Sequence, residues 1–235
     1  MNKVFSIAID GPSGAGKSTI AKKLANELDI MYLDTGALFR AVAYQALKLK
    51  VDPNDLEAVT EFIPEVELEI NFVNKEQRVS INEKDVTDFI RTEEVSIAAS
   101  DISVHPIIRN FILEKERELA SKESFVLDGR DIGTVVLPKA EVKIFLSASP
   151  EIRAKRRYKD LEKQSDDEVE YQQVLADILK RDKQDSSRKT APTKKAKDAV
   201  FLDSSNLTLA ETLAQVKKIV KEKLLKNQGC YENDK

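Results

Sequence analysis

The chain has 235 residues, of which 41% are hydrophobic and 34% are charged, and its formal net charge is −3. This length and balance predict a soluble globular protein with one sizeable core, and the slightly acidic charge argues against a general nucleic-acid or membrane surface. We expect no membrane span because no apolar run reaches about 18 residues, and no signal peptide because Asp10 soon interrupts the first apolar run.

Cysteine and histidine each occur once. Cys230 lies near the C-terminus and cannot form an internal disulfide, which suits a reducing compartment, so we expect a cytoplasmic protein. A single histidine excludes a histidine metal cluster. His105 precedes Pro106, which indicates a residue at the start of a helix.

A phosphate-binding loop follows the first predicted strand. Residues 4–9 form an apolar run typical of a buried strand, and residues 20–28 carry apolar side chains at helical spacing. The pattern G-x-x-x-x-G-K-[ST] between them is matched at every fixed position by the run of Gly11, Pro12, Ser13, Gly14, Ala15, Gly16, Lys17, Ser18 and Thr19. A chance glycine turn before an ordinary helix is the alternative, and the flanking elements argue against it.

The chemistry of this loop is specific. Glycines let successive backbone N–H groups point inward, and the following helix N-terminus adds further donors, so an anion is favoured there. Lys17 can reach the terminal phosphates of a nucleotide, and the Ser18 hydroxyl can ligate Mg²⁺.

The next elements alternate. An apolar strand at 30–33 ends at Asp34-Thr35-Gly36, which indicates the start of a helix running to about Lys48. From about Val66 apolar and polar residues alternate over 66–72 and 79–82, which predicts half-solvated antiparallel strands inserted in the fold. Helical spacing returns over 93–103 and 107–120.

Buried strands are predicted at 125–127, 142–146 and 199–202, followed by a helix over 209–225 and a polar tail. Strands that alternate with helices favour an α/β fold with a mostly parallel sheet covered on both faces.

Arginines crowd two later stretches. Arg153, Arg156 and Arg157 lie within five residues without an intervening acid, and Arg181 and Arg188 are interleaved with acids. Such runs are usually solvated helix faces. Beside a phosphate loop, they can instead neutralise the phosphates of two substrates, since the planar guanidinium pairs two oxygens at once.

Two further motifs end predicted strands, where ligands gather in open α/β sheets. They are L-D-T-G-A-L-F-R, ending at Arg40, and L-D-G-R-D-I-G-T, which contains Asp128 and Arg130. Asp128 could help hold Mg²⁺ through water, or equally serve as a helix cap or arginine partner. A GTPase is disfavoured because the chain has no N-K-x-D motif.

Together these motifs, with I-R-T-E-E-V-S and V-K-I-F-L, resemble the bacterial cytidylate kinase family of nucleoside monophosphate kinases over about residues 7–225. The resemblance implies a P-loop kinase fold in a single unit of several parts. These are a parallel-sheet core (1–60, 90–147 and 168–226), a monophosphate-binding insertion with a small antiparallel sheet (about 61–89), a lid (about 148–167) and a polar tail (227–235).

The resemblance also implies roles for individual residues. The catalytic set is Lys17, Arg130, Arg181 and Arg188. ATP would be bound by the residues from Gly11 to Thr19 and by Arg153, Arg156 and Arg157. The CMP-binding set is Thr35, Arg40, Ser100, Arg109, Asp128, Arg130, Asp131, Arg181, Asp185 and Arg188. Ser18 would ligate Mg²⁺, with Asp128 acting through water. On sequence alone, Ser100 reads as a packed helix residue and Arg109 as a surface charge.

The implied reaction is phosphorylation of CMP or dCMP by Mg²⁺-ATP, performed by a monomer without nucleic-acid or membrane partners. A kinase of UMP, shikimate or dephospho-coenzyme A on the same scaffold is the nearest alternative. A non-catalytic nucleotide-binding module is another, and an RNA-binding protein is disfavoured because the chain offers no aromatic stacking platform.

Overall fold

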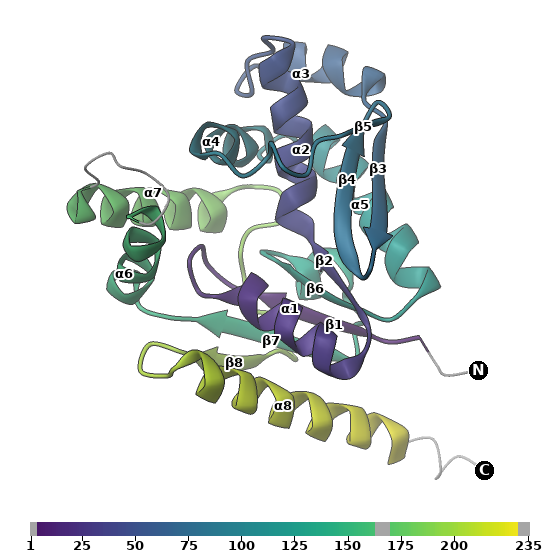
Figure 1. Ribbon diagram of the computed structural model, residues 1–235, viewed down its shortest axis with the longest axis vertical. Helices are drawn as coiled ribbons and strands as arrows, with labels where there is room; N and C mark the ends of the chain where they lie inside the picture. The colour runs from purple at the N-terminus through teal and green to yellow at the C-terminus, as the bar shows by residue number, and fades with distance from the viewer. Residues whose placement is uncertain (1–3, 163–169, 230–235) are drawn as a thin grey trace. The chain divides into compact units, whose positions relative to one another are not determined.

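The computed structural model describes residues 4–162 and 170–229 (Figure 1). The chain divides into two compact units: the first comprises the residues up to Ile30 and from Ser124 onward, and the second comprises Met31–Glu123. Part of the predicted lid (163–167), part of the predicted tail (230–235) and Cys230 lie outside the described residues.

A parallel sheet forms the centre of the first unit, as the sequence predicts. Its described strands β6 (Phe125–Gly129), β1 (Ser6–Asp10), β7 (Val142–Ser147) and β8 (Val200–Asp203) lie side by side in that order. The neighbouring strands are parallel throughout. Every residue of β1 is buried, as expected of a central strand. Their carboxyl ends therefore meet at one edge.

Helices complete the first unit. The helix α1 (Lys17–Leu28) packs on β6, and α8 (Leu209–Gly229) packs on α1 and β7. A short π-helical turn, η2 (Ile132–Val136), follows β6. The helices α6 (Pro150–Leu161) and α7 (Tyr171–Ser187), which the sequence analysis did not assign, pack together through Ala154, Val174 and Ile178.

The second unit combines helices with the predicted antiparallel sheet. The strand β2 (Met31–Asp34) leads directly into α2 (Thr35–Lys48), then α3 (Leu56–Phe62) and a 3₁₀ turn, η1 (Ile63–Glu65). The sheet contains β3 (Leu68–Val73), β4 (Glu76–Ile81) and β5 (Lys84–Asp85), and α4 (Glu93–Ile102) and α5 (Pro106–Lys122) follow. The alternation of apolar and polar residues therefore correctly indicated antiparallel pairing.

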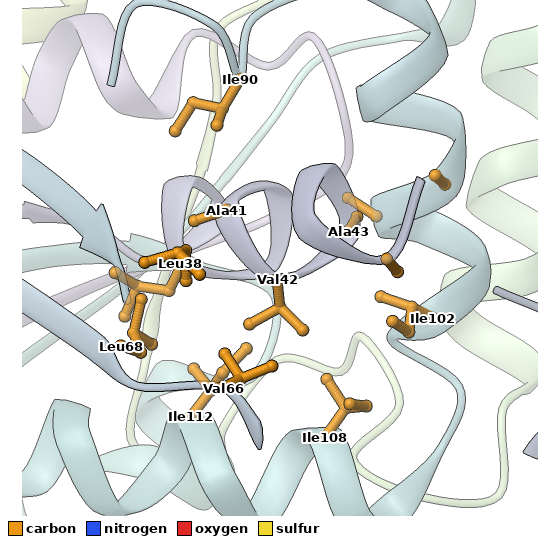
Figure 2. Packing of buried hydrophobic residues seen from close by; sticks show 14 of the residues in the cluster. Leu38, Ala41, Val42, Ala43, Val66, Leu68, Ile90, Ile102, Ile108 and Ile112 are labelled. Atoms are coloured by element: carbon orange, nitrogen blue, oxygen red, sulfur yellow. The ribbon is translucent and has the colours of Figure 1, made fainter. Parts of the chain in front are cut away.

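The core of the second unit surrounds α2. Figure 2 shows Val42 of α2 between Val66, Ile102 and Ile108, and all four side chains are buried. His105 is the N-cap residue of α5, as predicted, and its Nε2 lies 2.8 Å from the carbonyl oxygen of Pro53. None of the described helices combines the length and apolar composition that crossing a membrane requires.

Candidate active site

The phosphate loop joins β1 to α1 at the carboxyl edge of the sheet. Gly11 is required by a close approach, because a Cβ atom there would lie 1.9 Å from the carbonyl oxygen of Leu146 in β7. Gly16, the N-cap residue of α1, has a φ of 87°, a conformation that L-residues rarely adopt. No side chain among the described residues caps α1. The first N–H groups of the helix are thus suited to an anion.

Lys17 and Ser18 are the first two residues of α1, and their side chains form hydrogen bonds with different groups. Lys17 Nζ donates to the carbonyl oxygen of Pro12 at 2.8 Å, so the ammonium lies over the loop. Ser18 Oγ donates to Asp128 Oδ2 at 2.9 Å. The parallel register places Ile9 of β1 beside Asp128 of β6, which explains why the end of one strand reaches the helix that follows the other.

The oxygen atoms of Ser18 and Asp128 fit a magnesium ion. Hydroxyl and carboxylate oxygens are ligands that hard cations prefer, and Mg²⁺ usually takes only one or two of them from protein while keeping waters and substrate phosphates. Asp128 is only 5% exposed. The described residues contain no cluster of three or more acidic, histidine or cysteine ligands, so a cage made of protein alone is not offered there.

Burial governs the charge of Lys17. The pKa of the Lys17 ammonium falls to about 7, mainly because the group is buried; nearby Arg130 and Arg181 also lower it, and Asp128 and Asp185 oppose that shift. Buried cations are costly unless an anion approaches. A nucleotide phosphate would supply that anion.

A cluster of buried ion pairs lies beyond the ends of β6 and α7. Arg130 Nε donates to Asp185 Oδ2 at 2.8 Å, and Arg188 Nη1 lies 3.5 Å from Asp185 Oδ1. Arg188 Nη2 lies 3.5 Å from Asp131 Oδ1. Burial alone would raise the pKa of Asp185, but Arg130, Arg181 and Arg188 together hold it below its usual range. Three arginines facing two carboxylates leave positive charge for phosphate oxygens.

Asp10 forms hydrogen bonds with the backbone that directly follows Arg130 and Asp131. Its two carboxylate oxygens accept the N–H groups of Ile132 at 2.7 Å and Gly133 at 2.8 Å. These residues begin η2, directly after Arg130 and Asp131. Burial raises the pKa of Asp10 to about 6, although both backbone hydrogen bonds oppose that shift. The last residue of β1 thus fixes the turn that directly follows two predicted site residues.

Two of the three predicted lid arginines bind carbonyl oxygens of the phosphate loop. Arg153 is 3% exposed and donates to the carbonyl oxygen of Ser13 at 3.0 Å, while its Nη2 pairs with Asp182 Oδ2 at 2.6 Å. Arg156 Nη2 donates to the carbonyl oxygen of Ser204 at 2.8 Å, and its Nη1 lies 3.4 Å from that of Ala15. Arg157 lies half-buried in α6.

The second unit holds a separate group of predicted residues at the start of α2. Thr35 is the first residue of α2 and is 4% exposed. Asp34 is the N-cap residue; its Oδ1 accepts from the N–H of Ala37 at 3.0 Å, and its Oδ2 accepts from Arg40 Nη2 at 2.9 Å. Arg91 Nη2 lies 3.5 Å from the same oxygen. A helix N-terminus with two arginines suits an anion.

Ser100 and Arg109 lie around one turn of the second unit. Ser103 Oγ donates to the carbonyl oxygen of Ser100 at 2.8 Å, and Arg109 Nη1 donates to that of Ser103 at 3.3 Å. The guanidinium of Arg109 also lies over the ring of Phe39, 5.4 Å from its centroid. Arg109 is buried, so its reading as a surface charge is wrong.

The structure thus brings together Lys17, Ser18 and Asp128 in one group and Arg130, Asp131, Asp185 and Arg188 in another, both in the first unit. Thr35, Arg40, Ser100 and Arg109 belong to the second unit. Sequence reasoning missed the structural roles of Asp10, Gln77, Arg91 and Asp182; it indicated Asp34 at the start of a helix, as the structure confirms, but not its pairing with Arg40. The only signals were that Asp10 and Asp34 end apolar strands and that Arg91 falls in the motif I-R-T-E-E-V-S.

Comparisons with known sequences identify the family of the chain. The family model described as cytidylate kinase matches residues 7–222. Cytidylate kinase from Bacillus velezensis is 46% identical over 223 residues, covering 95% of this chain and 99% of that protein. Cytidylate kinase from Thermosipho melanesiensis is 48% identical over 218 residues, covering 92% of this chain and 97% of that protein.

Among solved structures, shikimate kinase from Acinetobacter baumannii in complex with shikimate is 20% identical with a TM-score of 0.44, and 96% of this chain and 95% of that chain are covered. The sequence matches decide the family, since both relatives and the family model span almost the whole chain. The chain belongs to the cytidylate kinase family.

Proposed function

We propose that this protein transfers the γ-phosphoryl group of Mg²⁺-ATP to CMP or dCMP, giving CDP or dCDP and ADP. The observation that carries the proposal is the cytidylate kinase match over residues 7–222. The phosphate loop, with Ser18 bonded to Asp128, supplies the chemistry expected at the donor end.

On the donor side, the loop from Gly11 to Thr19 binds the ATP phosphates, and Lys17 pairs with the terminal ones. Arg153, Arg156 and Arg157 complete the ATP-binding set. Arg153 and Arg156 donate hydrogen bonds to carbonyl oxygens of the loop, which supports a role in fixing the conformation of the loop. Mg²⁺, held by Ser18 and through water by Asp128, would neutralise charge on the phosphates.

On the acceptor side, Thr35, Arg40 and Arg130 bind the phosphate of CMP. Ser100, Arg109 and Asp131 read cytosine, which offers an amino donor and two acceptors, so that a carboxylate and a hydroxyl accept while an arginine donates. Arg181 and Asp185 contact the sugar. Arg188 binds phosphate and faces the transferring group, a role consistent with its contacts to Asp131 and Asp185.

Positioning and charge stabilisation supply the catalysis. The attacking oxygen already belongs to a phosphate, so little general-base help is needed. Together with Lys17, the side chains of Arg130, Arg181 and Arg188 stabilise the negative charge on the moving phosphoryl group. Closure of the lid, about residues 148–167, would exclude water that otherwise hydrolyses ATP.

The test is ADP formation from Mg²⁺-ATP with CMP, dCMP, UMP, AMP, GMP, shikimate, dephospho-coenzyme A or no acceptor. Turnover with CMP and dCMP that far exceeds the other rates is expected. Faster turnover of another acceptor would transfer the assignment to that substrate. Nucleotide binding without acceptor-dependent turnover would leave only a binding module.

We also propose that the enzyme acts as a monomer in the cytoplasm, without nucleic-acid or membrane partners. The net charge of −3 supports the absence of a polyanion partner. Light scattering at working concentrations should give a mass near the chain's 26.4 kDa. A mass of twice that value would contradict the monomer.

A further inference from the structure

Gln77 makes an unusual contact with the end of β2. It lies in β4 of the antiparallel sheet, and its side-chain amide meets the backbone of Asp34 on both sides. Gln77 Oε1 accepts the N–H of Asp34 at 2.7 Å, and Gln77 Nε2 donates to the carbonyl oxygen of Asp34 at 3.3 Å. A side-chain amide carries one acceptor and two donors, so it can satisfy a backbone residue as a neighbouring strand would.

The residue held in this way is the one that organises the start of α2. The Asp34 side chain is only 11% exposed and uses both oxygens. One caps the helix at Ala37, and the other accepts from Arg40. A shift of the Asp34 backbone therefore moves the oxygen that orients the Arg40 guanidinium.

The guanidinium of Arg40 lies close to Gly36. A Cβ atom on Gly36 would come within 3.0 Å of Arg40 Nη1 and 3.2 Å of Asp34 Oδ1. Arg40 is thus folded back against the backbone at the helix N-terminus. Its Nε is buried and has no hydrogen-bond partner among the described residues, which leaves a donor suited to a ligand oxygen.

We propose that Gln77 is a positioning residue for the acceptor phosphate: it fixes Asp34, and Asp34 holds Arg40 ready for the phosphate of CMP. Arginine side chains have many rotamers, so fixing one before the ligand arrives improves binding. The antiparallel sheet would then contribute to substrate binding through one amide. This inference rests on the proposed role of Arg40 in binding the acceptor phosphate.

The test is a double-mutant cycle of Gln77→Met with Arg40→Ala, using steady-state kinetics. Methionine keeps the length of glutamine but removes both hydrogen bonds. We expect Gln77→Met to raise KM for CMP about 3- to 10-fold, the size of one or two lost hydrogen bonds, and to leave KM for ATP within about twofold. In the Arg40→Ala background the same change should have almost no further effect on KM for CMP.

Arg78→Ala is the matched control. Arg78 is the next residue in β4, and its exposed guanidinium pairs with Asp85 and Asp88. Its loss should leave KM for CMP unchanged. Thermal unfolding of every variant shows whether the fold is retained. If Gln77→Met unfolds, Gln77→Glu is the second variant, because it keeps one acceptor for the N–H of Asp34 and replaces the donor. Gln77→Glu should raise KM for CMP at least as much.

The possible outcomes separate the two claims. If Arg40→Ala leaves KM for CMP unchanged, the proposed role of Arg40 fails. If Arg40→Ala raises KM for CMP but the folded Gln77 variant does not, Gln77 is no positioning residue. If both raise it and their effects multiply, Gln77 does not act through Arg40, and the inference is overturned.

Discussion

Arg130 and Arg188 are the side chains on which the proposed phosphoryl transfer most depends. Both are largely buried and share the Asp185 carboxylate. Replacing either with alanine should lower kcat by about 10²–10⁴, as expected for arginines that stabilise a transition state. Steady-state kinetics with CMP measures it, and Lys122→Ala, which removes an exposed pair with Glu118, is the control. A kcat within about twofold of wild type would remove that role.

Lys17, a proposed catalytic residue, is expected to lower the stability of the fold. Its pKa is about 7 in the folded chain and 10.5 ordinarily, so the unfolded chain binds more protons between these values. The resulting penalty on folding is largest at and below pH 7 and disappears as the pH rises towards 10.5. Lys17→Met should therefore stabilise the ligand-free enzyme by about 1–2 kcal/mol at pH 7 and lower kcat at least about 10²-fold.

Urea denaturation at pH 7 and pH 10 measures this difference in unfolding free energy. The advantage of Lys17→Met over wild type should shrink at the higher pH. A variant that is less stable than wild type at pH 7 would mean that the hydrogen bond to Pro12, not desolvation, dominates the energy of Lys17.

At the scale of elements, the side chain of Asp10 links the end of β1 to η2 by hydrogen bonds. Asparagine offers one acceptor oxygen where Asp10 offers two, so the N–H of Ile132 or Gly133 would lose its partner. Asp10→Asn should cost about 1–3 kcal/mol of unfolding free energy. The pKa of Asp10 is raised to about 6, so the wild type loses stability as pH rises from 4 to 6 and the non-titrating variant does not.

The gap between wild type and Asp10→Asn should therefore be wider at pH 4 than at pH 7. Denaturation curves at both values measure it, with Asp198→Asn as the control. Asp198 is 62% exposed and pairs with Lys143, so its effect should be small. An equal gap at both values would contradict a raised pKa of Asp10.

The core strands and the phosphate loop could be predicted because their signals are local. Residues 125–127 and 142–146 are continuous apolar runs, and the fixed positions of the loop are adjacent in sequence. The antiparallel sheet could also be predicted, because apolar and polar residues alternate over 66–72. The helices α6 and α7 were missed because charged residues fill them and only a few apolar positions, such as Val174 and Ile178, are buried.

The supporting contacts of the site could not be predicted because they join distant residues. Arg153 and Asp182 are 29 positions apart, and Gln77 and Asp34 are 43 apart. A sequence pattern predicts the structure of residues that are neighbours along one element. It does not indicate which glutamine contacts the end of which strand. The family resemblance gave roles to Arg153 and Arg40 but not the carboxylates that orient them.

For the whole molecule, the proposed ligands of the two substrates differ in their distribution. The proposed ATP ligands all belong to the first unit, whereas four of the proposed CMP ligands, Thr35, Arg40, Ser100 and Arg109, belong to the second. Binding slows local opening, so amide hydrogen exchange should slow where a ligand is held. Mg²⁺-ATP alone should protect the phosphate loop and the start of α1 and leave Met31–Glu123 near the ligand-free rate.

CMP alone should protect the start of α2 and the helices that carry Ser100 and Arg109, together with the segment around Arg130. Hydrogen exchange followed by mass spectrometry resolves these peptides. Arg40→Ala is the informative variant, because it should weaken the CMP-induced protection at the start of α2 while the ATP-induced protection of the loop remains. Protection by CMP confined to the first unit would contradict the roles assigned to Thr35 and Arg40, whatever the turnover of the enzyme.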